Sequence, residues 1–89
     1  MYITRETDYG VRCVLYLARK AQDIATVNEI AKAMHIPKSF SAKILQRLVK
    51  AGIVISGRGI GGGFSLAKKP GNISILDVVK AIQGDSAIN

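Results

Sequence analysis

The sequence predicts a mainly α-helical domain that carries one small β-hairpin. Four stretches place apolar residues at helical spacing, and a glycine-rich segment flanked by β-forming residues lies between the third and the fourth. The 89 residues, 48% of them hydrophobic, are enough for one compact core without disulfides or a structural metal. We therefore expect one domain over residues 1–84, followed by a tail at residues 85–89.

Composition narrows the class of protein. The single cysteine, Cys13, excludes an internal disulfide and a multi-cysteine metal site. No apolar run approaches the length of a membrane span, and the N-terminus lacks the pattern of a secretory signal. We expect a cytoplasmic protein with no membrane association, no metal and no cofactor. With one histidine, no paired carboxylates and no nucleophile near a base, we also expect that it is not an enzyme.

The first predicted helix runs from about residue 4 to residue 21. Thr4 can cap it, and Glu6 and Asp8 stand in its first turn, where the helix dipole favours acidic side chains. One apolar stripe is expected to face the core; it consists of Val11, Val14, Leu15, Ala18 and Ala21. A second stripe consists of Tyr9, Cys13 and Tyr16. That second stripe either contacts a partner subunit in a homodimer or belongs to a helix buried more deeply than average, with the cysteine as a packed hydrophobe.

The second predicted helix is short and begins after Thr26. Glu29 follows three residues later, which is the spacing of a capping box. His35, Ile36 and Pro37 end the helix, because a residue before proline avoids the α region. We interpret His35 as a turn or cap residue, since no second ligand stands at metal-binding spacing.

The third predicted helix runs from about Pro37 to Ala51, with Gly52 placed to end it. Its apolar face carries Phe40, Ile44, Leu45 and Leu48. The opposite face carries Lys43, Gln46, Arg47 and Lys50, while Lys38, Ser39, Ser41 and Ala42 occupy an exposed first turn and a half. Two short helices joined by a tight turn, the second of them cationic, predict a helix-turn-helix.

The glycine-rich segment that follows predicts a hairpin. Residues 53–55 lead into it and residues 64–66 lead out, with five glycines and Arg58 between them. A helix-turn-helix followed by a hairpin is the winged form of the motif. Gly57, Gly59 and Gly62 also spell a phosphate-binding pattern, but no helix opens at the last glycine, which disfavours that interpretation. A merely flexible hairpin stays an alternative. A last helix begins after Ser74 and ends at Gly84.

The net charge of +7 is confined to one part of the chain. Residues 38–69 hold seven of the cations and no Asp or Glu, whereas the remaining residues hold six cations and six acids. That segment contains both the third helix and the hairpin. A basic patch on one pair of elements is typical of a protein that binds a polyanion, and this favours DNA as the partner.

The residues resemble the Rrf2 (Rrf-two) family of bacterial winged helix-turn-helix transcription regulators, relatives of the iron-sulfur-cluster, nitric-oxide-sensing and cysteine-metabolism repressors. The matching stretches are Thr4-x-x-x-Asp8-Tyr9-Gly10-x-Arg12, Ile30-Ala31, Lys43-Ile44-Leu45, Leu48-x-Lys50-Ala51-Gly52-Ile53-Val54, Ser56-x-Arg58-Gly59-x-Gly61-Gly62-Gly63-Phe64-x-Leu66-Ala67 and Ile73-Ser74-x-x-Asp77-Val78. The hairpin signature is the most specific of them.

The resemblance implies a recognition helix at residues 37–51 in the major groove, a wing at the minor groove and a homodimer on a palindromic operator. The implied contacts at the start of the recognition helix are Ser39, Phe40, Ala42 and Lys43, and those of the wing are Arg58 and Gly59. Phe40 and Ala42 replace residues with more hydrogen-bonding capacity, so base readout should also depend on Lys38 and on DNA shape. From their charge, we expect Arg47, Lys50, Lys68 and Lys69 to contact phosphates.

Relatives that sense iron or redox state carry three cysteines after the last helix and bind an iron-sulfur cluster there. This chain has only Cys13, so we expect no cluster, and we interpret Asp8 as an acid at the helix dipole. The predicted function is that of a sequence-specific DNA-binding transcription regulator, as a repressor. The alternative is a winged-helix module that docks an acidic protein partner without binding specific DNA.

Overall fold

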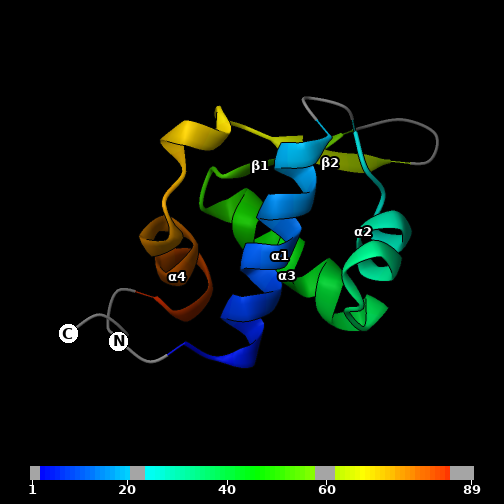
Figure 1. Cartoon of the computed structure of the whole chain (residues 1–89), viewed down its shortest axis with the longest axis horizontal. Coiled ribbons are helices and arrows are strands. Elements are labelled where there is room, and N and C mark those ends of the chain that lie inside the picture. The colour runs from blue at the N-terminus through cyan, green and yellow to red at the C-terminus, as the bar shows by residue number, and fades with distance from the viewer. Residues whose placement is uncertain (1–2, 21–23, 58–61, 85–89) are drawn as a thin grey trace.

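The computed structural model describes residues 3–20, 24–57 and 62–84. Figure 1 shows the described helices and the hairpin, and the predicted class of a mainly α-helical winged helix-turn-helix is confirmed. The elements in chain order are α1 (Arg5–Arg19), α2 (Val27–Met34), α3 (Lys38–Lys50), β1 (Val54–Gly57), β2 (Gly63–Leu66), a 3₁₀ turn (Pro70–Asn72) and α4 (Ile75–Gln83).

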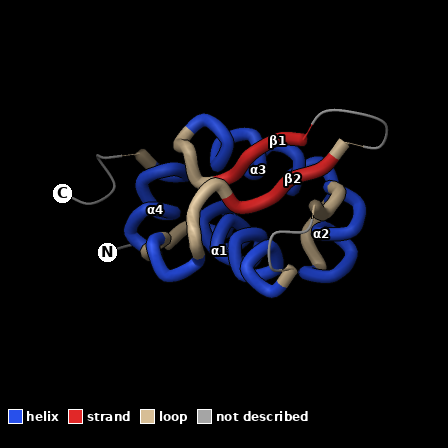
Figure 2. Tube along the Cα trace, turned by 90° about the horizontal axis from the view of Figure 1, so that it is seen from above, coloured by secondary structure: helices blue, strands red, loops and turns tan. Residues whose placement is uncertain are grey.

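Helix α1 lies at the centre of the arrangement. It packs against α2, α3, α4 and strand β2, so residues from both ends of the chain meet on it. Seen from above in Figure 2, the two strands run side by side across one end of the helical group. The side chains that are almost fully buried come from all four helices and include Leu17, Ile30, Leu45, Leu48 and Val79. None of the helices in the described parts of the chain is long and apolar enough to cross a membrane.

The buried stripe of α1 differs from the predicted one. Leu15 is 51% exposed, whereas Gly10, Cys13 and Leu17 are buried. Gly10 determines this rotation, because it allows α4 to approach so closely that a Cβ there would lie 3.1 Å from Ile82 Cγ1. The prediction that the second stripe contacts a partner was therefore wrong for Cys13, which is 0% exposed within its own chain.

The other members of that second stripe also belong to the core of this chain. Tyr9 and Tyr16 are partly buried and pack against the central cluster of apolar side chains. The deeper burial of α1 is thus the interpretation that the structure supports. Burial also raises the pKa of the Cys13 thiol to about 12, so this thiol stays neutral at physiological pH.

Local capping confirms most of the predicted helix ends. Thr4 accepts a hydrogen bond from the backbone N–H of Thr7 at 3.2 Å, and Thr26 accepts one from that of Glu29 at 3.1 Å. Ser74 and Asp77 form a reciprocal capping box with distances of 2.9 and 3.0 Å. Each such cap is worth about 1 kcal/mol, which explains why short helices begin at these residues.

The turn of the helix-turn-helix depends on His35. Its backbone is left-handed, with φ 56° and ψ 47°, and its N–H donates to the carbonyl of Ala31. The predicted cap role of His35 is therefore confirmed. Pro37 then stands at the N-cap of α3, one residue before the helix, and Gly52 follows the helix with φ +78°.

The strands extend further into the glycine-rich segment than predicted. Their register pairs Val54 with Leu66 and Gly57 with Gly63. The connection before α2, predicted to be a simple polar link, pairs with the hairpin as well: the N–H of Ala25 donates to the carbonyl of Phe64 at 2.9 Å, and the reverse bond measures 2.8 Å. This correction has a clear cause, because the link must cross the sheet edge to reach α2.

Candidate nucleic-acid interface

Helix α3 separates a buried face from an exposed one. Ile44, Leu45 and Leu48 are at most 1% exposed, and they fix the helix against α1, α2 and α4. The exposed residues of the predicted interface on this helix are Lys38, Ser39, Phe40, Ala42, Lys43, Arg47 and Lys50. The structure thus brings these residues together on one helix, with its N-terminal half open to solvent.

Ser41 is the exception in the first turn and a half. We expected it to be exposed, but it is 0% exposed and its hydroxyl has no hydrogen-bond partner in the described structure. The reason is its spacing: Ser41 stands three residues before Ile44 and four before Leu45, so it shares their face.

Phe40 belongs partly to the support of α3 and partly to its surface. Its side chain is 37% exposed, and its ring lies 5.9 Å from that of Tyr9, tilted by 58°. Tyr9 is in turn covered by the guanidinium of Arg12, at 5.6 Å from the ring centroid. The start of α3 is therefore held by an aromatic side chain of α1.

Arg12 also holds the turn that precedes α3. Its Nη1 donates to the carbonyl of Met34 at 3.3 Å, and its Nη2 lies 2.9 Å from Asp8 Oδ2. Asp8 therefore does more than face the helix dipole, which was its predicted role: it also pairs with Arg12. Sequence reasoning missed this contact because Arg12 and Met34 are brought together only by the packing of α1 on α2.

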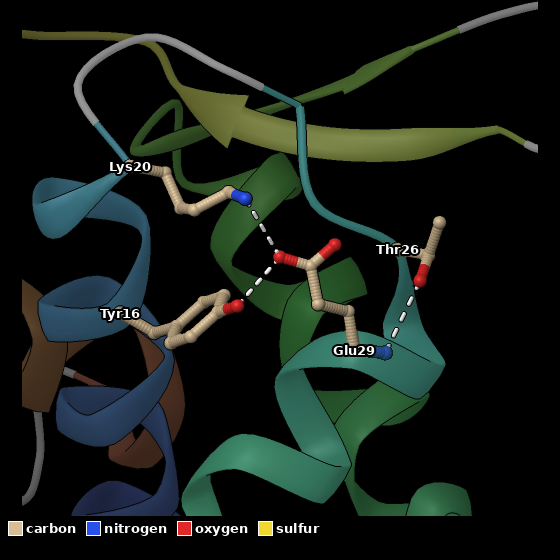
Figure 3. Close-up of polar contacts among 4 residues, drawn as sticks. All are labelled: Tyr16, Lys20, Thr26 and Glu29. Atoms are coloured by element: carbon tan, nitrogen blue, oxygen red, sulfur yellow. Dashed lines mark hydrogen bonds and ion pairs between the residues drawn. The ribbon is translucent and has the colours of Figure 1, made fainter.

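The opposite end of α2 is tied to α1 by the Glu29 carboxylate (Figure 3). Tyr16 Oη donates to Glu29 Oε2 at 2.5 Å, and Lys20 Nζ lies 3.0 Å from the same oxygen. The Tyr16 hydrogen bond, followed by that of Lys20, lowers the pKa of Glu29. The same hydrogen bond raises the pKa of Tyr16, because ionisation would remove the donated proton. Both ends of α2 are thus fixed to α1.

The remaining predicted cations have different environments. Lys50 is exposed on the last turn of α3, and Lys68 and Lys69 are exposed after β2. Lys68 is close enough to Asp77 to help lower the pKa of that carboxylate, although the main cause is the hydrogen bond from the Ser74 backbone. Arg47 donates from Nη1 to the carbonyl of Ile82 at 2.9 Å. Arg58 and Gly59, the predicted wing contacts, lie outside the described residues.

No ligand set for a metal ion occurs within residues 3–20, 24–57 and 62–84: these segments hold no group of three His, Cys, Asp or Glu side chains suited to one. The buried Cys13 is unsuited to the task in any case, because its thiol stays protonated.

The short turn, the exposed start of α3 and the paired strands after it define a winged helix-turn-helix domain of the kind that transcription regulators use. The chain belongs to the Rrf2 family. A family model with the description "Iron-dependent Transcriptional regulator" matches residues 3–89.

Relatives and solved structures agree with this assignment. Protein aau3 of Rhizobium meliloti (strain 1021) is 36% identical over 88 residues, which are 99% of this chain and 57% of that protein. An HTH-type transcriptional regulator of Aquifex aeolicus (strain VF5) is 43% identical over 72 residues, 81% of this chain and 50% of that protein. This chain therefore spans about half the length of these relatives.

Two solved structures have the same fold. CymR (YrzC), the global cysteine regulator of B. subtilis, has a TM-score of 0.87 and 26% identity, and the match covers 94% of this chain and 66% of that one. IscR of T. potens has a TM-score of 0.80 and 26% identity, with 91% of this chain and 60% of that one covered. Both names are those of regulators and not of enzymes.

Proposed function

We propose that this chain is the DNA-binding part of a transcription regulator, acting in the cytoplasm as a repressor, with α3 in the major groove of its operator. The observation that carries the proposal is the exposed N-terminal half of α3, where Lys38, Ser39, Ala42 and Lys43 are open to solvent while the buried face of the helix is fixed by the core. A helix held in this way can present its first turns to base edges.

The exposed side chains suit distinct kinds of contact. Ser39 can exchange hydrogen bonds with bases or phosphates, Lys43 can donate to guanine acceptors, and Phe40 and Ala42 offer apolar surface for a thymine methyl group. Lys38, Lys50, Lys68 and Lys69 supply charge for phosphates. Arg58 and Gly59 belong to the proposal through the sequence alone, as a wing that reaches the minor groove.

The proposal includes a homodimer on a palindromic operator. Cys13 is buried in its own chain and takes no part in such a dimer. The apolar residues that remain available on this side of the molecule are Leu15 on α1 and Ile75 and Leu76 on α4, which are 51%, 61% and 40% exposed.

A selection from random duplexes followed by mobility-shift titration tests the function. We expect one palindromic sequence to be enriched, and we expect binding to weaken on the order of a thousandfold between about 50 and about 200 mM salt if about six phosphates are contacted. Lys43→Ala should weaken binding to the selected sequence more than binding to a random duplex, because Lys43 stands at the start of α3.

Lys32→Ala provides the matched control, since Lys32 is an exposed lysine on α2 and outside the proposed interface. It should leave both affinities nearly unchanged. If no sequence is enriched and binding does not depend on salt, the proposed function is wrong, and a domain that docks an acidic protein becomes the better account.

A further inference from the structure

Arg47 connects the proposed recognition helix to the end of α4. Its Nη1 donates to the main-chain carbonyl of Ile82 at 2.9 Å in a partly shielded position. Ile82 lies in the last turn of α4, where carbonyl groups have no partner within the helix. The guanidinium therefore satisfies one of these carbonyls and places a positive charge at the negative end of the helix dipole.

The residue after Ile82 is tied to α1. The Oε1 of Gln83 accepts a hydrogen bond from the backbone N–H of Thr4 at 3.0 Å and another from the hydroxyl of Thr7. Thr4 is the N-cap of α1, so the amide oxygen lies at the positive end of that helix. The last two residues of α4 are thus held by α3 on one side and by α1 on the other.

This junction borders the side chains that face the proposed DNA. A surface hollow of about 430 Å³ is lined by Thr4, Glu6, Phe40, Lys43, Arg47, Ile82 and Gln83. Phe40 and Lys43, two residues of the proposed interface, therefore lie beside the same junction. A small rotation of α3 away from α4 would change the direction in which both of them point.

From its charge alone, Arg47 would contact a phosphate. The observed hydrogen bond directs the guanidinium toward Ile82 instead. We propose that Arg47 is a positioning residue for DNA recognition: it fastens α3 to the end of α4, and its loss reduces sequence discrimination while leaving phosphate attraction in place. The inference rests on the proposed function, since it assigns a role within the same interface.

Comparison of Arg47→Met with Lys50→Ala tests it. Methionine keeps an unbranched apolar stem and removes the donor, while Lys50 is an exposed cation one turn further along the same helix. We expect Arg47→Met to bind the selected duplex about tenfold more weakly and to bind a random duplex as wild type does, with the same salt slope. Lys50→Ala should weaken both and reduce the salt slope by about 0.9 per site. Equal losses on both duplexes with a reduced slope in Arg47→Met would overturn the inference.

A measurement without DNA separates this inference from the proposed function. In ¹⁵N NMR of the wild-type protein, rotation of the Arg47 guanidinium should be slowed, and the ¹³C resonance of the Ile82 carbonyl should move in Arg47→Met but not in Lys50→Ala. If no duplex is bound, the proposed function fails and with it the role in recognition, although the NMR result still establishes the contact. Free rotation of the guanidinium in the wild-type protein would refute the contact itself, and this result needs no variant to fold.

Discussion

Gly63 is the residue whose substitution should disturb the hairpin most. Its φ is +151°, a conformation that residues with a side chain rarely adopt, and a Cβ built on it would lie 2.0 Å from Cγ2 of Ile24. Ile24 cannot move away easily, because the next residue, Ala25, is paired with Phe64 through two hydrogen bonds. Gly63→Ala must therefore push the connection before α2 away from β2 or distort the strand.

The expected loss can be built from these two effects. Forcing an extra methyl group into a packed site costs about 1 to 3 kcal/mol. Holding alanine in an unfavourable backbone conformation adds roughly 1 kcal/mol. A total of about 2 to 4 kcal/mol should lower the midpoint of thermal unfolding by roughly 10 to 30 °C in a domain of this size.

A double-mutant cycle measured by urea and thermal unfolding tests the cause. Ile24→Ala removes Cγ2 and leaves a Cβ at 3.5 Å from the new methyl group, which is an ordinary contact. Ile24 is 57% exposed, so its own truncation should cost little. The double variant should then recover about 1 to 3 kcal/mol relative to the sum of the single changes. Losses that add within about 0.5 kcal/mol would show that the contact with Ile24 is not the cause.

Two further changes test buried or shared polar groups. Ser41→Ala should leave the free energy of unfolding unchanged or raise it by up to about 1 kcal/mol, because a buried hydroxyl without a partner is removed; a clear loss in urea unfolding would show that the hydroxyl is bonded. Tyr16→Phe should lower stability near neutral pH. Because the pKa of Glu29 lies below its ordinary value of 4.5, this difference from wild type should shrink as pH falls through the lowered pKa, and because the pKa of Tyr16 is raised above 10.0, it should shrink again as pH rises through that value. A difference that stays constant across pH would contradict the assignment of the Tyr16–Glu29 bond.

The helix boundaries could be predicted because they depend on local chemistry. Thr4, Thr26 and Ser74 each accept a hydrogen bond from a backbone N–H three residues later, and this needs no knowledge of the rest of the fold. The left-handed His35 was also indicated by its neighbours, since proline follows two residues later. Only the exact first residue of α3 and the 3₁₀ turn at Pro70–Asn72 escaped.

The buried face of α1 could not be predicted in the same way. Two apolar stripes competed for the core, and hydrophobicity alone favoured the one that contains Leu15. The choice depends on α4, which approaches α1 over Gly10 and so turns Cys13 and Leu17 inward. Information of this kind lies in a contact between residues more than sixty positions apart, and no local pattern contains it.

The same limit applies to the charges of the proposed interface. The seven cations of residues 38–69 are free of acids in sequence, yet the fold places Lys68 close to Asp77 and gives Arg47 a carbonyl partner. Of the cations on α3, this leaves Lys38, Lys43 and Lys50 as exposed lysines that can meet phosphates. Three lysines per subunit correspond to six in the proposed dimer, and six phosphate contacts imply a slope of about −5 in a plot of log affinity against log salt concentration. A much steeper slope would mean that the cations after the hairpin, or Arg58 within it, contribute strongly, so the slope itself measures how much of the DNA attraction belongs to the recognition helix.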